Sequence, residues 1–214
     1  MDYFRPPGMD TSEQFDCYRT CQIEEQRPLK PIRKIVLMDG MDVVFRRSEE
    51  QRLTVSANDP MAIVAIETAF YDGILVIRRN RSQGAGADAD SHERTVVAIS
   101  LPLAPSIKVK GKSDLTLLGL VQSDLDIQVS GGGYVAAHGQ IARLGAWVFG
   151  SGEVNARELQ ADDAVLSVSG AGYIKAHVRT KVKARVMGGG DIVIRGNPPQ
   201  RERQVTGFGG IVFF

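Results

Sequence analysis

The sequence is poor in the residues that most often reveal a compartment or a cofactor. Only 2 of its 214 residues are cysteine, and no run of about 18 apolar residues could form a membrane span. The residues before Ile32 lack the apolar centre of a signal peptide, so the chain as written predicts a cytoplasmic protein. Lys and Arg total 26 against 25 Asp and Glu, and a formal charge of +1 argues against nucleic acid or an anionic membrane as partner.

Motifs for catalysis and metal binding are missing as well. The sequence contains no Walker loop, no dinucleotide fingerprint, no Gly-x-Ser-x-Gly and no calcium-binding nonapeptide series. Cys17 and Cys21 are too few for a zinc site, and two alternatives stay open for them: free thiols, or a disulfide or redox pair. We therefore expect no catalytic residue, no metal and no cofactor, and a protein that is not an enzyme.

A glycine recurs through the second half of the chain at intervals of 18 to 20 residues. A valine stands two positions before each glycine, and a leucine, valine or isoleucine stands four positions after it. Self-similarity at this period, carried by glycine and β-branched residues, is typical of a chain wound into a stacked β-solenoid. The glycines are Gly111, Gly131, Gly150, Gly170, Gly188 and Gly207, and the valines are Val109, Val129, Val148, Val168, Val186 and Val205.

Most of these glycines open a triplet of small residues. Small residues let successive coils approach at a sharp corner to the strand spacing of about 4.8 Å. The alternation of apolar and polar residues on either side of the corner places one face of each short strand inside. The sequence therefore predicts an all-β fold, a parallel β-helix with coils of about 19 residues and a less regular N-terminal β part.

The composition divides the chain into a tail and one domain. Residues 1–31, rich in charge and proline, predict a polar N-terminal tail. Residues 32–214 predict the β-helix domain, with irregular coils and a hairpin over 32–106 and regular coils over 107–214. Asp72-Gly73 between two apolar runs predicts a hairpin turn, whereas the run from Met61 to Ile66 is compatible with a strand or with a helical turn.

Three stretches of the regular half are similar to a known family. They are Val168 to Ile174, Gly190 to Pro198 and Gly207 to Gly209. On these residues the chain resembles the bacterial autotransporter adhesin head domain, or head GIN domain, over about residues 32 to 214. The resemblance implies a parallel β-helix, an adhesin-like role and a place at the envelope or the cell surface.

Outward positions of the repeat supply the candidate binding residues. One set stands seven positions after the corner glycines: His138, Arg157, His177 and Arg195. Stacked, this set would form a basic stripe, which is either a pH-dependent site for an anion or acidic glycan or a plain solvated surface. Three positions after the glycines, Tyr134 and Tyr173 alternate with acidic residues; their rings either stack on sugars or cover the strands.

These patterns favour a non-enzymatic β-solenoid that is a binding or scaffolding surface, with a glycan or a surface protein as partner. The alternative is a carbohydrate-binding or carbohydrate-active β-helix protein that uses Tyr134 and Tyr173. The acidic residues between them would lie two coils apart, near 10 Å, beyond the roughly 5 to 9.5 Å of paired-carboxylate glycosidases. The apolar end from Ile211 to Phe214 has no evident polar cap and predicts self-association through the C-terminal coil, unless another segment covers it.

Overall fold

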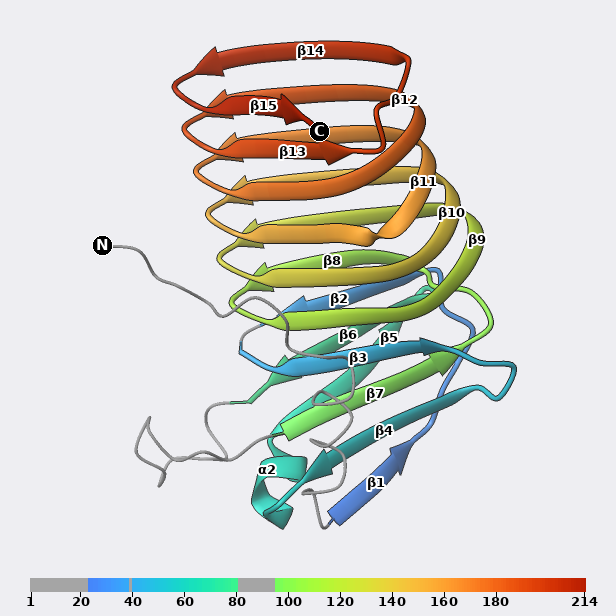
Figure 1. Cartoon of the computed structure of the whole chain (residues 1–214). Helices are drawn as coiled ribbons and strands as arrows, with labels where there is room; N and C mark the ends of the chain where they lie inside the picture. The colour runs from blue at the N-terminus through green and yellow to red at the C-terminus, as the bar shows by residue number, and fades with distance from the viewer. Residues whose placement is uncertain (1–22, 39, 81–94) are drawn as a thin grey trace.

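The computed structural model describes residues 23–38, 40–80 and 95–214. Cys17 and Cys21 lie outside these residues, so nothing is added to the two alternatives for them. The described chain winds into a stack of coils in which most strands pair in parallel (Figure 1). The predicted all-β fold, a parallel β-helix, is therefore confirmed. Over these same ranges, no helix has the length and apolar composition needed to cross a bilayer.

The regular coils consist of four long strands with shorter strands before and after them. Each coil has a front wall, which follows the glycine corner, and a back wall, which leads to the next corner (Figure 1). Each long strand bends and contributes to both walls, and it pairs in parallel with the coils on either side. The strands are β8 (Ser106–Gly111), β9 (Asp114–Gly131), β10 (Tyr134–Gly150), β11 (Glu153–Gly170), β12 (Tyr173–Gly188), β13 (Asp191–Arg195), β14 (Gln200–Gly207) and β15 (Gly210–Phe213).

The inward valine column is confirmed. Its six members are register partners from one coil to the next, and the first five are fully buried. Val205 is 43% exposed because its strand, β14, pairs with only one other described strand, β12. The valines lie on the back wall, just before the corners. A second inward column, on the front wall after the corners, is filled by three small residues that are fully buried: Ala137, Ala156 and Ala176.

Backbone geometry requires small residues at the corners. Gly170 has a φ of 121°, a conformation that residues with a side chain rarely adopt. A Cβ atom on Gly172 would overlap a methyl group of Val148 in the coil before. The N–H of Ala171 donates to the carbonyl oxygen of Gly150 at 2.9 Å, so the hydrogen-bonded ladder continues through the corner. The corners therefore keep successive coils in register.

The N-terminal part adds two layers of parallel strands to the stack, and the strands beyond them run antiparallel. β2 (Lys34–Met38) pairs in parallel with β8 and β6 (Ile74–Arg79) on the back wall. β3 (Asp42–Arg47) pairs in parallel with β9 and β7 (Thr95–Leu101) on the front wall. Beyond these strands, β4 (Arg52–Ala57) pairs antiparallel with β7 on the front wall. On the back wall, β5 (Ile66–Tyr71) pairs antiparallel with β6.

The predicted hairpin at Asp72-Gly73 is confirmed. These two residues join β5 to β6 and have φ values of 46° and 71°, as the predicted turn requires. The run that starts at Met61 begins as a helical turn, α2 (Pro60–Val64), and continues as β5. The Asp59 carboxylate accepts a hydrogen bond from the Met61 N–H at 3.2 Å and caps this helix.

One strand lies within the segment expected to be a polar tail. β1 (Ile23–Arg27) pairs antiparallel with β4, from Ile23 opposite Ala57 to Arg27 opposite Leu53. It is an edge strand of the front wall, held mainly by backbone hydrogen bonds, and its middle residues are exposed. A polar edge strand lacks the alternating apolar signal, which is why the sequence did not reveal it. The sheet thus includes residues ahead of the expected boundary at residue 31.

The last coil has two arginines at inward positions beside the apolar end from Ile211 to Phe214, whose Phe214 is 72% exposed. Arg201 and Arg203 of β14 take positions of the inward columns, opposite Val182 and Ala184 of the coil before. The Arg201 guanidinium lies 4.6 Å from the centroid of the Phe213 ring, which it covers. Charged residues at inward positions of an edge oppose the addition of another apolar strand.

Candidate functional site

The front wall carries an outward row in which acidic and aromatic side chains alternate. The register pairs one residue from each coil, and neighbouring members are separated by the strand spacing of about 4.8 Å. The row expected three positions after the corner glycines is therefore confirmed, and β3 extends it by one further residue. In order along the stack, the members are Asp42, Asp114, Tyr134, Glu153, Tyr173 and Asp191.

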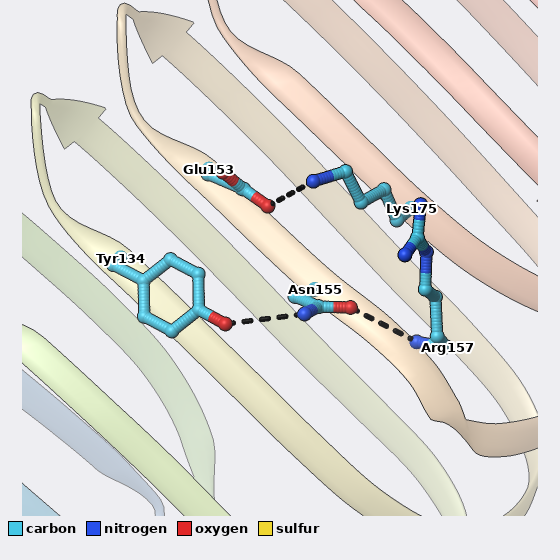
Figure 2. Close-up of polar contacts among 5 residues, drawn as sticks. All are labelled: Tyr134, Glu153, Asn155, Arg157 and Lys175. Atoms are coloured by element: carbon cyan, nitrogen blue, oxygen red, sulfur yellow. Dashed lines mark hydrogen bonds and ion pairs between the residues drawn. The ribbon is translucent and has the colours of Figure 1, made fainter. Parts of the chain in front are cut away.

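Polar contacts join this row to the next outward row, two positions further along each strand. Asn155 Nδ2 donates to Tyr134 Oη at 3.1 Å, and Lys175 Nζ lies 2.7 Å from Glu153 Oε1 (Figure 2). Lys175 Nζ also lies 5.7 Å from the centroid of the Tyr173 ring. We call these five residues, Tyr134, Glu153, Asn155, Tyr173 and Lys175, the Tyr134–Tyr173 face.

Neighbouring carboxylates set the electrostatics of this face. The side chains of Glu153 and Lys175 are only 32% and 24% exposed, so their ion pair is partly shielded from water. A hydrogen bond to the Asp191 carboxylate raises the pKa of the Tyr173 phenol, and partial burial raises this pKa further. Tyr173 is therefore a neutral hydrogen-bond donor at physiological pH, and 40% of its surface is exposed.

Arg157 reaches this part of the front wall because β11 has an irregularity at its bend. Ala156 pairs with Ala176 of β12, but the next pair is Gln160 with His177, so β11 has extra residues between them. In this irregular stretch the Arg157 N–H donates to Asn155 Oδ1 at 3.4 Å, and the side chain extends toward Lys175 (Figure 2).

The Arg157 guanidinium has an unused donor. Its Nε is buried and has no hydrogen-bond partner within the described parts of the chain. An unpaired donor removed from water costs about 1–3 kcal/mol, so folded proteins rarely leave one without a partner of some kind. Arg157 therefore adds a partly buried cation beside the Tyr134–Tyr173 face.

The structure brings together only part of the expected basic stripe. His177 and Arg195 are register partners on adjacent coils. His138 instead pairs with Glu158, and His177 pairs with Gln160 on its other side, because β11 is longer at the bend than β10 and β12. Counting from the corner glycines cannot detect this slip, since it assumes that every coil has the same number of residues between the corner and the bend, and Arg157 lies within the irregular stretch of β11.

Asn155 and Lys175 were missed in the sequence analysis, although the sequence contains a signal for them. Both stand five positions after a corner glycine, two positions beyond the row of Tyr134 and Tyr173. In a strand, residues two apart share a face, so the outward row alone locates them. The contacts that join the two rows depend on side-chain conformation and come from the structure.

Three solved structures have a similar fold. A putative adhesin from Bacteroides fragilis is 21% identical, with a TM-score of 0.70, and the match covers 90% of this chain and 96% of that one. A putative adhesin and a putative lipid binding protein, both from Parabacteroides distasonis, are each 17% identical, with TM-scores of 0.55 and 0.51 and the same coverage. At these identities the likeness shows the fold alone.

A search of curated proteins finds no match for this sequence. Residues 32–198 match the family described as putative auto-transporter adhesin, head GIN domain. This match spans most of the chain, from β2 through the glycine-cornered coils that carry the Tyr134–Tyr173 face. The chain therefore belongs to the family of putative auto-transporter adhesin head GIN domains.

Proposed function

We propose that the chain is a non-enzymatic, adhesin-type protein that binds its ligand through the Tyr134–Tyr173 face together with Arg157. The observation that carries this proposal is the 40% exposed ring of Tyr173, which lies beside the Lys175 ammonium group in a row of paired polar side chains. Membership of the adhesin family supports the role and a place at the envelope or cell surface.

A glycan is the ligand class that best matches this surface. The exposed ring of Tyr173 offers a flat apolar patch on which a sugar ring can stack. Asn155, Arg157 and Lys175 surround it with groups that bind hydroxyl and carboxylate oxygens. His177, on the same strand as Lys175, and its register partner Arg195, on the next coil, extend the basic surface. His138 lies opposite Glu158, so its coil contributes less positive charge.

A glycan array combined with an assay for released reducing sugar tests this proposal. We expect the wild-type protein to retain at least one glycan without cleaving it, and Arg157→Gln and Tyr173→Ala to lose that binding. Tyr71→Ala is the matched control, because Tyr71 is a 66% exposed tyrosine on β5, in the N-terminal part. If the array retains nothing, or if both variants bind as the wild type does, the proposal fails.

A carbohydrate-active enzyme is the second candidate, and one observation favours it. Asp42 and Asp114 are register partners, so they lie on strands about 4.8 Å apart, near the 5–5.5 Å that separates the carboxyl groups of retaining glycosidases. The same reducing-sugar assay decides between the two candidates. Sugar release by the wild type and its loss in Asp42→Asn would establish the enzyme and overturn the non-enzymatic proposal.

Self-association through the C-terminal coil stays a prediction. Exposed Phe208 and Phe214 and the free edge of β14 support it. Arg201 and Arg203 at inward positions oppose it, because a second copy would have to cover their charges. Light scattering at micromolar concentration tests the prediction: a monomer contradicts it, and a dimer that dissociates on Phe208→Asp supports it.

A further inference from the structure

The back wall carries a hollow around the only tryptophan of the chain. Its volume is about 390 Å³, and it crosses four successive coils from Trp147 through Val165 and Lys183 to Glu202. Trp147 is partly exposed, and Val165 is 42% exposed although it is apolar. Ligand sites have this general composition, with an aromatic and apolar lining and a few placed polar groups.

The residue two positions before Trp147 makes room for its ring. Position 145 is glycine, and a Cβ atom there would overlap the Trp147 ring and the Asp126 carboxylate. Because Gly145 has no side chain, the indole lies across the backbone of its own strand. Gly145 therefore permits this placement of the partly exposed ring.

The polar side of the hollow has an excess of positive charge. Lys183 Nζ pairs with Glu202 Oε2 at 2.9 Å, so these two charges compensate each other. Arg185 is held by a neutral partner: its Nε and Nη2 donate to Gln204 Oε1 at 3.0 and 2.7 Å. The Gln204 contact orients the guanidinium without neutralising it, and a planar, oriented guanidinium is well suited to bind a carboxylate.

From this arrangement we propose that the back-wall hollow binds an acidic saccharide. Trp147 stacks on a sugar ring, and Arg185, positioned by Gln204, binds the carboxylate of that sugar or of its neighbour. The Ser167 hydroxyl and Val165 line the floor between them. The site is independent of the Tyr134–Tyr173 face, because it lies on the opposite wall and shares no residue with it.

Titration with acidic trisaccharides tests this site, followed by tryptophan fluorescence and by calorimetry. Trp147 is the single tryptophan, so its emission reports on the hollow alone. The probes are trigalacturonic acid and 3′-sialyllactose, with maltotriose as the neutral control. We expect a saturable change in emission with at least one acidic probe, and a Kd at least about tenfold higher in Arg185→Gln, the factor expected for a lost charged hydrogen bond.

Two further variants separate the site from a general effect of charge. Arg179→Gln removes an arginine of the same strand that pairs with Asp162 outside the hollow, and it should leave the Kd unchanged. Trp147→Phe should weaken binding in calorimetry. The proposal is overturned if neither acidic probe binds, if binding leaves the emission unchanged, if maltotriose binds equally well, or if Arg179→Gln weakens binding as much as Arg185→Gln. Loss of glycan binding on the front wall alone would not affect it.

Discussion

The regular coils and the N-terminal part of this protein share the same two walls but turn their chain in different ways. In the regular coils every turn at the glycine corner repeats the one before, and the backbone ladder passes through it. In the N-terminal part the chain turns through a hairpin, the short helix α2 and antiparallel strands. Only the repeated corner places equivalent side chains in straight rows, which is why the candidate binding rows lie in the regular coils.

The interiors of the two regions differ as well. The regular coils have an inward column of fully buried alanines on the front wall, including Ala156. Phe45 of β3 and Leu53 of β4 fill the wider interior of the N-terminal part. The difference indicates that repetition permits a thin, tightly packed stack, whereas the individual N-terminal turns depend on larger side chains. Four substitutions test this comparison, from the largest effect to the smallest.

Val168→Asp should have the largest effect. Val168 is fully buried in the inward column, and an unpaired carboxylate at this position would be removed from water. We expect a loss of more than about 4 kcal/mol of unfolding free energy in urea denaturation, or failure to fold. Val165→Asp is the matched control on the same strand, because Val165 is 42% exposed, and it should cost little. Equal midpoints for the two variants would contradict the register.

Gly172→Ala should cause the next largest loss of unfolding free energy. The new Cβ would overlap a methyl group of Val148 and lie 2.7 Å from the carbonyl oxygen of Gly152. We expect a cost of about 2 kcal/mol or more, since neither the backbone nor the column can move freely. Gly189→Ala, at another corner, meets nothing within 4 Å and should stay within about 0.5 kcal/mol of the wild type. A similar cost for both would mean that the corners are not close-packed.

Gly40→Ala addresses the N-terminal part. Gly40 has a φ of 59°, but a Cβ atom there meets nothing within 4 Å. Only backbone strain remains, and we expect a cost of about 1 kcal/mol in the same urea experiment. A cost as large as that of Gly172→Ala would remove the distinction between repeated, close-packed corners and single, open turns.

Asp191→Asn should have the smallest effect on stability, but it should clearly change the pKa of Tyr173. The Asp191 carboxylate raises the pKa of Tyr173, so its removal should lower this pKa toward the ordinary value, as measured by NMR of ring-labelled tyrosine. Glu153→Gln should lower it less, because Glu153 acts through charge alone. The folded-state pKa is raised, so the associated stability is present below about pH 10 and is lost as the pH rises through the folded pKa. An unchanged Tyr173 pKa in Asp191→Asn would contradict the contact.

Almost every feature of the regular coils could be predicted from the sequence. The corner glycines, the valine column and the row of Tyr134 and Tyr173 follow from a period of about 19 residues combined with strand alternation. These features repeat because each coil packs against its neighbours in the same way. Their repetition allows them to be recognised in a single sequence. The hairpin at Asp72-Gly73 was readable for another reason, since few residue pairs tolerate its backbone conformation.

The remaining features depend on local departures from the repeat. The extra residues in β11 shift the register at the bend, so they separate His138 from Arg157 and aim Arg157 at the front wall. β1 is polar and lies at an edge of the sheet, and Arg203 takes an inward position that Leu166 and Ala184 occupy in the two coils before it. Such features depend on which strand is adjacent in space, and a single sequence does not report that.

The most direct test of the account is amide hydrogen exchange at the corners, because the rows on both walls depend on coils that stack through them. The N–H groups of Ser151 and Ala171 donate to Gly131 and Gly150 of the coils before, at 3.0 and 2.9 Å. We expect both amides to exchange within about tenfold of the amides in the middle of β10 and β11, as part of one cooperative unit. Exchange at the rate of an unstructured peptide would show that the corners are open, and it would contradict the fixed register.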